Sequence, residues 1–380
     1  MAVPSSNLAA EYQSLKPEID EAIMRVLASG NYVLGEELEA FEEAFAEYQN
    51  ARFAMGVGSG TASLHLALEA MDLQPGDEVI TVPNTDNPTA SVVTHAGAKV
   101  VLADTTPDTF NMDPEKLEQY ITPRTKVILP VHLFGHPADM DPIMEIADHH
   151  GITVIEDACL AIGAEYKGRR MGTYGPLGCF SVAPGKILGG YGDGGMIVSN
   201  DPDMAERIRV LRNYGHAPRV PRFPGDLTGG KWTVLEEGFN QRLDTIQAAI
   251  LRAKLPTLDD RIDGRRRAAA IYREIFEGTP VTAAHEEPWA KHVYFAYNAM
   301  LDNRDEAQAY MNSRGIPARL IYNPPLHLHP AYSWMGLGPG SLPTAEYTAS
   351  RMLGLPCFPQ ITESQVEEVA TTLVKFAEGG

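Results

Sequence analysis

Two residues with reactive side chains stand out in this sequence, a lysine at position 186 and an aspartate at position 157. Lys186 has small and apolar neighbours and precedes the glycine run 189-GGYGDGG-195. Desolvation disfavours the ammonium form of a lysine, and a neutral amine can attack a carbonyl to form a Schiff base. Asp157 ends the apolar, β-branched run 152-ITVIED-157, and a carboxylate buried there needs a compensating partner.

Both residues also have ordinary interpretations. Lys186 could be a surface lysine, and Asp157 could be a strand-end residue or a helix N-cap. Glu156 precedes Asp157 and would point to the opposite face of a strand, so only one of the two carboxylates can reach a given ligand.

A glycine turn at 58-GSGT-61 adds a third element of a candidate site. Glycine permits close approach of the backbone and helix N-termini bind anions, so Ser59, Gly60 and Thr61 could cradle a phosphate. Ser181 could add a hydroxyl donor, or it could be buried and satisfied locally. The turn alone is a weak signal, because many strand–Gly–helix turns bind nothing and this one lacks the lysine of a P-loop.

Together, the lysine, the carboxylate and the turn meet the requirements of a pyridoxal phosphate site. The lysine would form the Schiff base and the backbone amides would hold the phosphate. The carboxylate would face the pyridinium nitrogen and keep the ring protonated, so that the ring could accept electrons.

The elements that must position these residues alternate between helical and strand-like segments. Helical patterns fall at 36–50, 61–71 and 139–151, and strand-like runs fall at 52–60, 76–83, 99–105, 125–135 and 151–158. Apolar strands separated by helices predict a mostly parallel sheet covered on both faces. Ligands of such sheets bind beyond the carboxyl ends of the strands, which is where Asp157 and the glycine turn fall.

The chain changes character after about residue 250. Residues 244–278 predict long helices, a further helix follows at 304–315, and a closing helix begins at Glu363. We therefore expect a large cofactor-binding domain at 1–250, whose N-terminal segment could pack with the second domain. Residues 251–380 would hold the linking helices and a smaller α+β domain.

Composition argues against several classes of partner. The 380-residue chain has a formal net charge of −19, which disfavours nucleic acid because phosphate backbones need clustered Lys and Arg. No run of about 18 apolar residues predicts a membrane span. Three scattered cysteines, and the lack of a recognisable signal peptide, predict a cytoplasmic protein with neither a disulfide framework nor a metal cluster.

Several blocks of sequence, in order, are similar to those of a known family. They include "SGTASLHLALEAM", "GDEVITVP", "HLFGHPADMDPI", "FSVAPGKILGGYGDGGMIVSN" and "GFNQRLDTIQAAI". The chain resembles the vitamin-B6-dependent sugar aminotransferases, the DegT/StrS-like branch of the fold-type-I aspartate aminotransferase superfamily, over nearly its whole length. The resemblance implies an α/β fold with a mostly parallel seven-stranded sheet and a smaller α+β C-terminal domain. It implies pyridoxal 5′-phosphate as cofactor, with pyridoxamine 5′-phosphate as its intermediate form.

The resemblance also implies roles for individual residues. Lys186 would be the Schiff-base lysine and Asp157 the pyridinium partner, with Ser181 and the Gly60–Thr61 turn as phosphate ligands. Asn240, in "GFNQR", looks like the family asparagine that reaches the phosphate of the neighbouring subunit's cofactor. That role would make the active unit a homodimer with shared active sites, although Asn240 could instead be a helix cap.

Two positions depart from the family pattern. Counting back from Gly97, Asp86 takes the place of the usual aromatic residue that stacks on the cofactor ring. Leu160 stands where the family often has Gln or His, which can bond the phenolic oxygen of the cofactor. Losing both contacts should weaken cofactor binding or alter its electronics. Asp86 could instead contact a substrate amine or hydroxyl.

The resemblance implies a ping-pong transamination in the biosynthesis of amino sugars, antibiotics or polysaccharides. Glutamate or glutamine would donate the amino group, and a nucleotide-linked keto-sugar would accept it. A cyclitol of the scyllo-inosose type is the rival acceptor. The candidate substrate contacts are Arg242, Arg319, Tyr322, His327 and His329. Arg242 could instead form an interface salt bridge, and the others could be loop residues and a core tyrosine.

Other functions have less support. A dehydratase of the same family would replace the lysine by histidine, whereas Lys186 is present. A cofactor-binding regulatory or sensor protein without turnover is supported only by the departures at Asp86 and Leu160. A dehydrogenase with a Rossmann fold is disfavoured, because no G-x-G-x-x-G follows the first strand.

Overall fold

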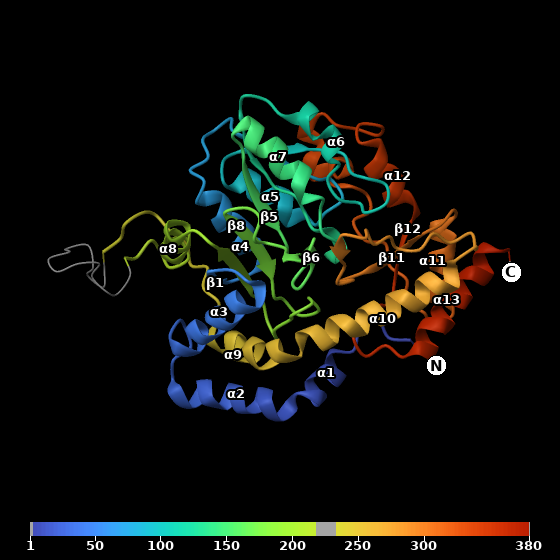
Figure 1. Ribbon diagram of the computed structural model, residues 1–380, viewed down its shortest axis with the longest axis horizontal. Helices are drawn as coiled ribbons and strands as arrows, with labels where there is room; N and C mark the ends of the chain where they lie inside the picture. The colour runs from blue at the N-terminus through green and yellow to red at the C-terminus, as the bar shows by residue number, and fades with distance from the viewer. Residues whose placement is uncertain (1–2, 218–232, 380) are drawn as a thin grey trace.

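The centre of the molecule is a seven-stranded sheet, seen in the computed structural model of residues 3–217 and 233–379 (Figure 1). In spatial order its strands are β1 (Phe53–Val57), β9 (Gly195–Ser199), β8 (Leu177–Ser181), β5 (Thr153–Asp157), β4 (Thr125–Ile128), β2 (Glu78–Thr81) and β3 (Lys99–Leu102). Within this sheet β9 runs antiparallel to both of its neighbours, and the other pairs are parallel. The predicted mostly parallel sheet is confirmed.

Alternating side chains explain why helices cover both faces of the sheet. Ile155 and Cys179 lie in one buried apolar cluster, whereas their chain neighbours Val154 and Phe180 lie in another. Successive side chains of a strand point to opposite faces, so the sheet must be covered twice. The first face is covered by α4 (Gly60–Glu69), α5 (Asn87–His95) and α8 (Pro202–Leu211). The second is covered by α3 (Glu36–Gln49), α7 (Met140–His150) and α9 (Thr245–Lys254).

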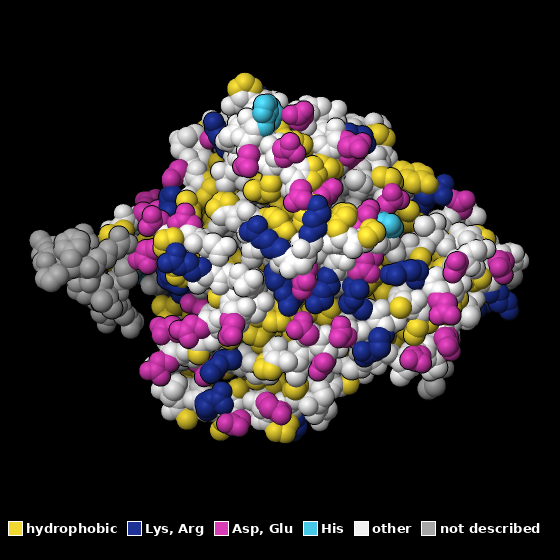
Figure 2. All heavy atoms as spheres, viewed as in Figure 1, with side chains coloured by type: hydrophobic (Ala, Val, Ile, Leu, Met, Phe, Trp, Pro, Cys, Tyr) yellow, Lys and Arg dark blue, Asp and Glu magenta, His cyan; other side chains and the backbone are white. Residues whose placement is uncertain are grey.

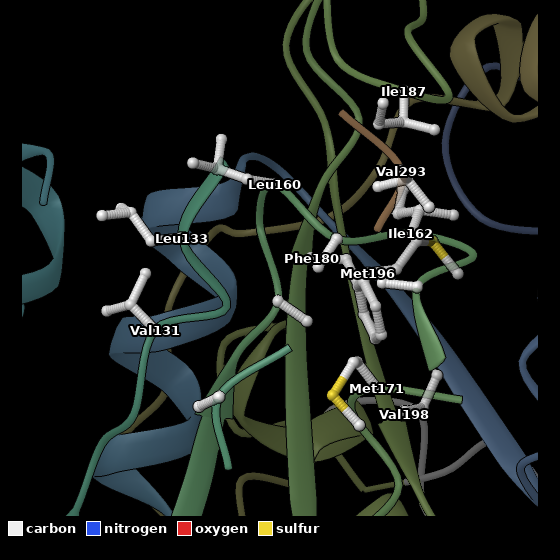
Figure 3. Close-up of a cluster of buried hydrophobic side chains, with 14 of the residues drawn as sticks. Val131, Leu133, Leu160, Ile162, Met171, Phe180, Ile187, Met196, Val198 and Val293 are labelled. Atoms are coloured by element: carbon white, nitrogen blue, oxygen red, sulfur yellow. The ribbon is translucent and has the colours of Figure 1, made fainter. Parts of the chain in front are cut away.

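The cluster on the second face supports the loops that follow β5 and β8. Figure 3 shows Phe180 and Met196 packed with Met171 and Val198, all of them in this cluster. The same cluster extends to Leu160, three residues beyond the end of β5. A dense apolar support of this kind limits the movement of the loops above it.

The C-terminal part of the chain has a separate apolar core that includes Val3. The long helix α10 (Leu258–Phe276) leads into it, and α13 (Glu363–Ala377) packs along α10 (Figure 1). Beside them lie α11 (Arg304–Ser313) and an antiparallel pair, β11 (Tyr297–Met300) with β12 (Met352–Leu355). This separate core supports a division of the chain near residue 250, which remains a proposal.

The other elements of the described chain are shorter or peripheral. They are α1 (Leu8–Ser14), α2 (Lys16–Ser29), α6 (Pro114–Leu117), α12 (Pro343–Arg351), β6 (Glu165–Tyr166), β7 (Arg169–Arg170) and β10 (Ala290–Lys291), with 3₁₀ turns at Glu118–Tyr120, Leu133–Gly135, Leu255–Thr257, Leu326–Leu328 and Pro330–Met335. Among residues 3–217 and 233–379, no helix combines the length and the apolar character that a membrane span requires. Figure 2 shows acidic and basic side chains interspersed over the face in view.

Candidate active site

An open cavity of about 170 Å³ lies at the carboxyl ends of β1, β5 and β8. Lys186 and Asp157 both line it. Its walls also contain seven other residues singled out in the sequence: Ser59, Gly60, Thr61, Asp86, Leu160, Ser181 and Tyr322. The parallel sheet thus brings together side chains that lie far apart in the chain.

Asp157 is the last residue of β5 and is only 3% exposed. Its carboxylate accepts the Thr89 hydroxyl at 2.8 Å and the Cys159 backbone N–H at 3.1 Å. Both donors are neutral, and no Lys, Arg or His of the described chain forms an ion pair with Asp157. A buried carboxylate that faces a cavity with only neutral donors suits a ligand with a cationic N–H group.

Glu156 points to the opposite face, as the alternation along β5 predicts. It is fully buried, and its carboxylate lies 3.1 Å from His132 Nε2. It also accepts three backbone N–H groups of the segment 172–175, at 2.6–2.9 Å. Glu156 is therefore occupied in holding the fold, and Asp157 alone of the two carboxylates serves the cavity.

The glycine turn after β1 opens α4 with free amide groups. The Ser59 hydroxyl caps the helix by accepting the Ala62 N–H at 3.0 Å. The N–H groups of Gly60 and Thr61 find no acceptor among the described residues, and both residues line the cavity. A β-carbon on Gly60 would lie 2.6 Å from the Ser181 β-carbon, so glycine is needed for this close approach. The free amides and the Ser181 hydroxyl form a cradle that suits an anion.

Lys186 lies in the turn after β8, where its backbone N–H donates to the Ala183 carbonyl at 3.1 Å. The side chain is half-buried, and Nζ lies 4.9 Å from the centre of the Phe295 ring. No carboxylate pairs with this amine within residues 3–217 and 233–379. Burial is the main cause of the raised pKa of the Cys159 thiol, and the negative charge of Asp157 raises that pKa further. The positive charge of Lys186 acts in the opposite direction. Lys186 and Asp157 therefore both act on Cys159 and line one cavity, and the amine is available to a ligand.

Tyr322 brings an aromatic ring to the cavity from the C-terminal part of the chain. Its ring lies nearly parallel to that of Phe134, with 5.6 Å between their centres. Burial raises the pKa of the Tyr322 hydroxyl, and the charges of Asp86 and Asp157 act in the same direction.

Asp86 and Leu160, the two departures from the family pattern, both line the cavity. The exposed Asp86 side chain accepts the Asn87 N–H at 2.8 Å and so caps α5. Leu160 is buried and offers the cavity an apolar surface. The exposed Asp86 carboxylate can therefore also contact a ligand in the cavity.

Two of the substrate candidates line neighbouring cavities. Arg319 lines a second cavity of about 390 Å³, and Lys186 lines both this cavity and the first. The Arg319 Nη2 donates to Ser5 Oγ at 2.9 Å. His329 lines a third cavity of about 350 Å³, and its Nε2 lies 2.9 Å from the Pro324 carbonyl.

The other candidates lie outside these cavities. His327 is buried and its Nε2 lies 3.0 Å from a Glu346 carboxylate oxygen, which makes it part of the packing of α12. Asn240 is exposed and forms a backbone bridge with Asn213, and the N-cap position of α9 is held by Asp244, so Asn240 is not the cap of that helix. Arg242 Nη1 donates to the Asn213 side chain at 3.1 Å. Asn240 and Arg242 do not line the cavity of their own chain.

Several residues of the site were not identified from the sequence. They are Thr85, Thr89, Cys159, Asp193 and Phe295. Thr85 and Thr89 are four positions apart where α5 begins, a spacing that could have indicated two hydroxyls on one side. Asp193 is the one charged residue of the glycine run. Nothing in the local sequence relates Phe295 to Lys186, because only the packing of the C-terminal part brings them together.

These features fit pyridoxal phosphate on three independent grounds. A half-buried amine with no carboxylate partner in the described residues suits an aldehyde. A buried carboxylate with neutral donors suits the protonated ring nitrogen. The free amides of α4, together with the space that only glycine leaves beside Ser181, suit a phosphate.

Comparison with known proteins supports the same assignment. The sequence profile of the DegT/DnrJ/EryC1/StrS aminotransferase family matches residues 13–374. The chain is 42% identical to the dTDP-3-amino-3,4,6-trideoxy-alpha-D-glucose transaminase of Streptomyces venezuelae, over 99% of this chain and 96% of that protein. It is also 41% identical to a pleiotropic regulatory protein of Geobacillus stearothermophilus, over 99% of each chain.

Solved structures share the fold. DesV of S. venezuelae, in complex with a ketimine intermediate, has a TM-score of 0.94 and 41% identity, and the match covers 100% of this chain and 99% of that chain. NtdA of Bacillus subtilis, with bound pyridoxamine phosphate, has a TM-score of 0.85 and 28% identity, and the match covers 96% and 82% of the two chains. The expected fold class is confirmed, and pyridoxal 5′-phosphate is the cofactor.

Proposed function

The chain belongs to the DegT/DnrJ/EryC1/StrS aminotransferase family, and we propose that it moves an amino group from glutamate or glutamine to the ketone of a nucleotide-linked sugar. It is a pyridoxal-phosphate-dependent aminotransferase. The observation that carries the proposal is that Lys186, the buried Asp157 carboxylate and the start of α4 line one cavity.

We assign the roles as follows. When bound, pyridoxal phosphate supplies an aldehyde that takes up the amino group and a ring that accepts electrons. The Lys186 amine anchors the cofactor and, once released, moves a proton at the α-carbon of the donor as a general acid–base. Asp157 keeps a proton on the ring nitrogen. Ser181 and the turn 59–61 bind the phosphate.

The acceptor is proposed to occupy the first and third cavities together. The two share Thr85, Asp86 and Tyr322, so a ligand can extend from Lys186 into the third cavity. Asn323 and His329 line that further space and offer hydrogen bonds to sugar hydroxyls. The S. venezuelae relative, named for a dTDP-linked sugar, supports an acceptor of this class.

We further propose that the active unit is a cytoplasmic homodimer with shared active sites. Asn240 is exposed and outside the cavity of its own chain, which suits a contact with the cofactor phosphate of a partner. Val234 and Leu235 precede Asn240 by five or six positions, and the Tyr214 N–H donates to the carbonyl of the adjacent Phe239; the exposed apolar side chains of these three residues would be covered by a second copy. All three cysteines are free, which suits a reducing compartment.

The test compares the wild-type protein with Lys186→Ala, and with Lys126→Ala as a control for an exposed lysine. Wild type and control should bind the cofactor with a Schiff-base absorbance, lose that absorbance when glutamate is added, and aminate a nucleotide-linked keto-sugar. Lys186→Ala should show neither the absorbance nor turnover. Normal transamination by Lys186→Ala would refute the assignment.

Two further outcomes would revise the proposal. If the enzyme responds to glutamate but aminates cyclitol ketones and no sugars, the acceptor class is wrong. If neither glutamate nor glutamine alters the bound cofactor, a regulatory function without turnover replaces catalysis. The regulatory relative in G. stearothermophilus makes that second outcome worth measuring.

A further inference from the structure

Three buried side chains form a chain of hydrogen bonds that ends on Asp157. Thr85 Oγ1 lies 3.0 Å from Thr89 Oγ1, and Thr89 Oγ1 lies 2.8 Å from Asp157 Oδ2. Each of the three residues is at most 4% exposed. Thr85 precedes the cap of α5 and Thr89 lies in its first turn, so the start of one helix supplies both hydroxyls.

The direction of this chain follows from the chemistry of its groups. An ionised carboxylate only accepts hydrogen bonds, so the Thr89 hydroxyl must donate its one proton to Asp157. Thr89 then has only its lone pairs left for Thr85, which makes Thr85 the donor in that contact. Both hydroxyl protons therefore point along the chain toward the carboxylate.

We propose that Thr89 is a positioning residue for the aminotransferase reaction, whose hydroxyl, supported by Thr85, orients the Asp157 carboxylate and keeps it ionised. The inference rests on the proposed role of Asp157 at the ring nitrogen of the cofactor. Hydrogen bonds to the charged form of an acid favour that form, and an ionised Asp157 is what holds the ring nitrogen in its protonated state.

The surroundings of Asp157 leave Thr89 with a large share of this task. The other donor to the carboxylate is the Cys159 N–H, at 3.1 Å. Burial raises the pKa of the Cys159 and Cys179 thiols, so these neighbours stay neutral. Lys186 is the nearby cation, and Tyr322, Asp86 and Asp193 are the other titratable groups that line the same cavity. Without the Thr89 hydroxyl, the buried Asp157 carboxylate would keep only the Cys159 N–H as a donor among the described residues.

The other end of the chain reaches the substrate region. Thr85 lines both the first and the third cavity, together with Asp86 and Tyr322. A hydroxyl at this boundary therefore connects the space proposed for the acceptor with the carboxylate that faces the cofactor. Thr85 does not contact Asp157 itself, but its hydrogen bond to Thr89 should make its loss affect the same property in the same direction.

The experiment measures the protonation of the cofactor directly. The holoenzyme is prepared with pyridoxal phosphate labelled with ¹⁵N in the ring, and the nitrogen signal is followed by NMR as a function of pH. The variants are Thr89→Val, Thr89→Ser, Thr85→Val and Asp157→Asn. Thr94→Val is the control, because Thr94 is an exposed threonine of α5 whose hydroxyl bonds only the Ser91 carbonyl among the described residues.

We expect Thr89→Val to lower the pH at which the ring nitrogen loses its proton by about one unit, a tenfold change in proton affinity. Thr89→Ser should restore the wild-type titration, since it keeps the hydroxyl. Thr85→Val should give a smaller shift in the same direction, and Thr94→Val should give none.

Each remaining outcome is decisive for one of the two proposals. If Asp157→Asn shifts the titration but Thr89→Val does not, the positioning role of Thr89 is wrong and the role of Asp157 stands. If Asp157→Asn has no effect, the proposed role of Asp157 fails as well. Should Thr89→Val not fold, Thr85→Val becomes the test, and a titration equal to that of Thr94→Val overturns the inference.

Discussion

Gly60 and Ser181 approach so closely that a β-carbon on Gly60 would lie 2.6 Å from the Ser181 β-carbon. The contact joins the start of α4 to the end of β8, two elements separated by most of the sheet-forming sequence. It places two free backbone amides beside a hydroxyl in the cavity. The geometry of the proposed phosphate cradle therefore depends on the absence of one methyl group.

Gly60→Ala should weaken cofactor binding. Overpacking of this kind costs about 1–3 kcal/mol, which corresponds to a roughly fivefold to 150-fold loss of affinity if the cradle opens to relieve it. Titration of the apoenzyme with pyridoxal phosphate measures the change. Gly338→Ala is the matched control, because a β-carbon at Gly338 meets no atom within 4 Å. Equal affinities in the two variants would show that the cradle does not hold the phosphate.

Asp86→Asn should impair use of the acceptor while leaving the fold intact. Asparagine caps a helix as well as aspartate does, so α5 should keep its stability. The loss of a charged acceptor for a substrate hydroxyl is worth about 1.5–3 kcal/mol, so kcat/KM for the acceptor should fall at least about tenfold. The half-reaction with glutamate should be unchanged.

The control for Asp86→Asn is Asp201→Asn, since Asp201 is also the N-cap of a helix, α8, and lies outside the lining of the cavity. Steady-state kinetics at varied acceptor concentrations separates the two variants. An acceptor kcat/KM equal to that of the control would remove Asp86 from the substrate site.

His136 should make the protein less stable as the pH falls below neutrality. Its Nε2 accepts the Glu287 N–H at 3.1 Å and its Nδ1 lies 2.8 Å from the Pro137 carbonyl, so the ring is held in its neutral form. Burial lowers the pKa of His136 from 6.5 to about 4, and burial also lowers the pKa of His292, whose ring lies 5.2 Å away.

The sign of this effect follows from proton binding. Between pH 6.5 and about 4 the unfolded chain binds a proton at His136 and the folded chain does not. The free energy of unfolding therefore decreases as the pH is lowered through that window. Acidification from pH 7 to 5 should cost about 2 kcal/mol at this residue alone. Urea unfolding at several pH values should give a shallower slope for His136→Gln than for wild type. Identical slopes would contradict the account.

The positions of the candidate site residues were predictable where they depend on local sequence. Asp157 follows a β-branched run, and a parallel strand that is buried on both faces carries its last side chain to the ligand-binding edge. The alternation within β5 also separated Asp157 from Glu156 correctly. The glycine turn combined a strand end with a helix start, and both elements form close to the predicted residues.

The parts that could not be predicted depend on contacts between distant segments. Tyr322 and His327 lie five residues apart in one loop, yet one lines the cavity and the other packs against Glu346. No periodic pattern distinguishes them, because the loop has no regular side-chain direction. The contact of Phe295 with Lys186 likewise depends on how the C-terminal core packs on the sheet.

The most direct test of the account is to identify the side chain that anchors the cofactor. The holoenzyme is reduced with borohydride and digested, and the peptide that carries the cofactor is sequenced by mass spectrometry. The account predicts that the label lies on Lys186, in the peptide that follows β8. A label on any other lysine, or no covalent label in a protein that still holds the cofactor, would contradict it.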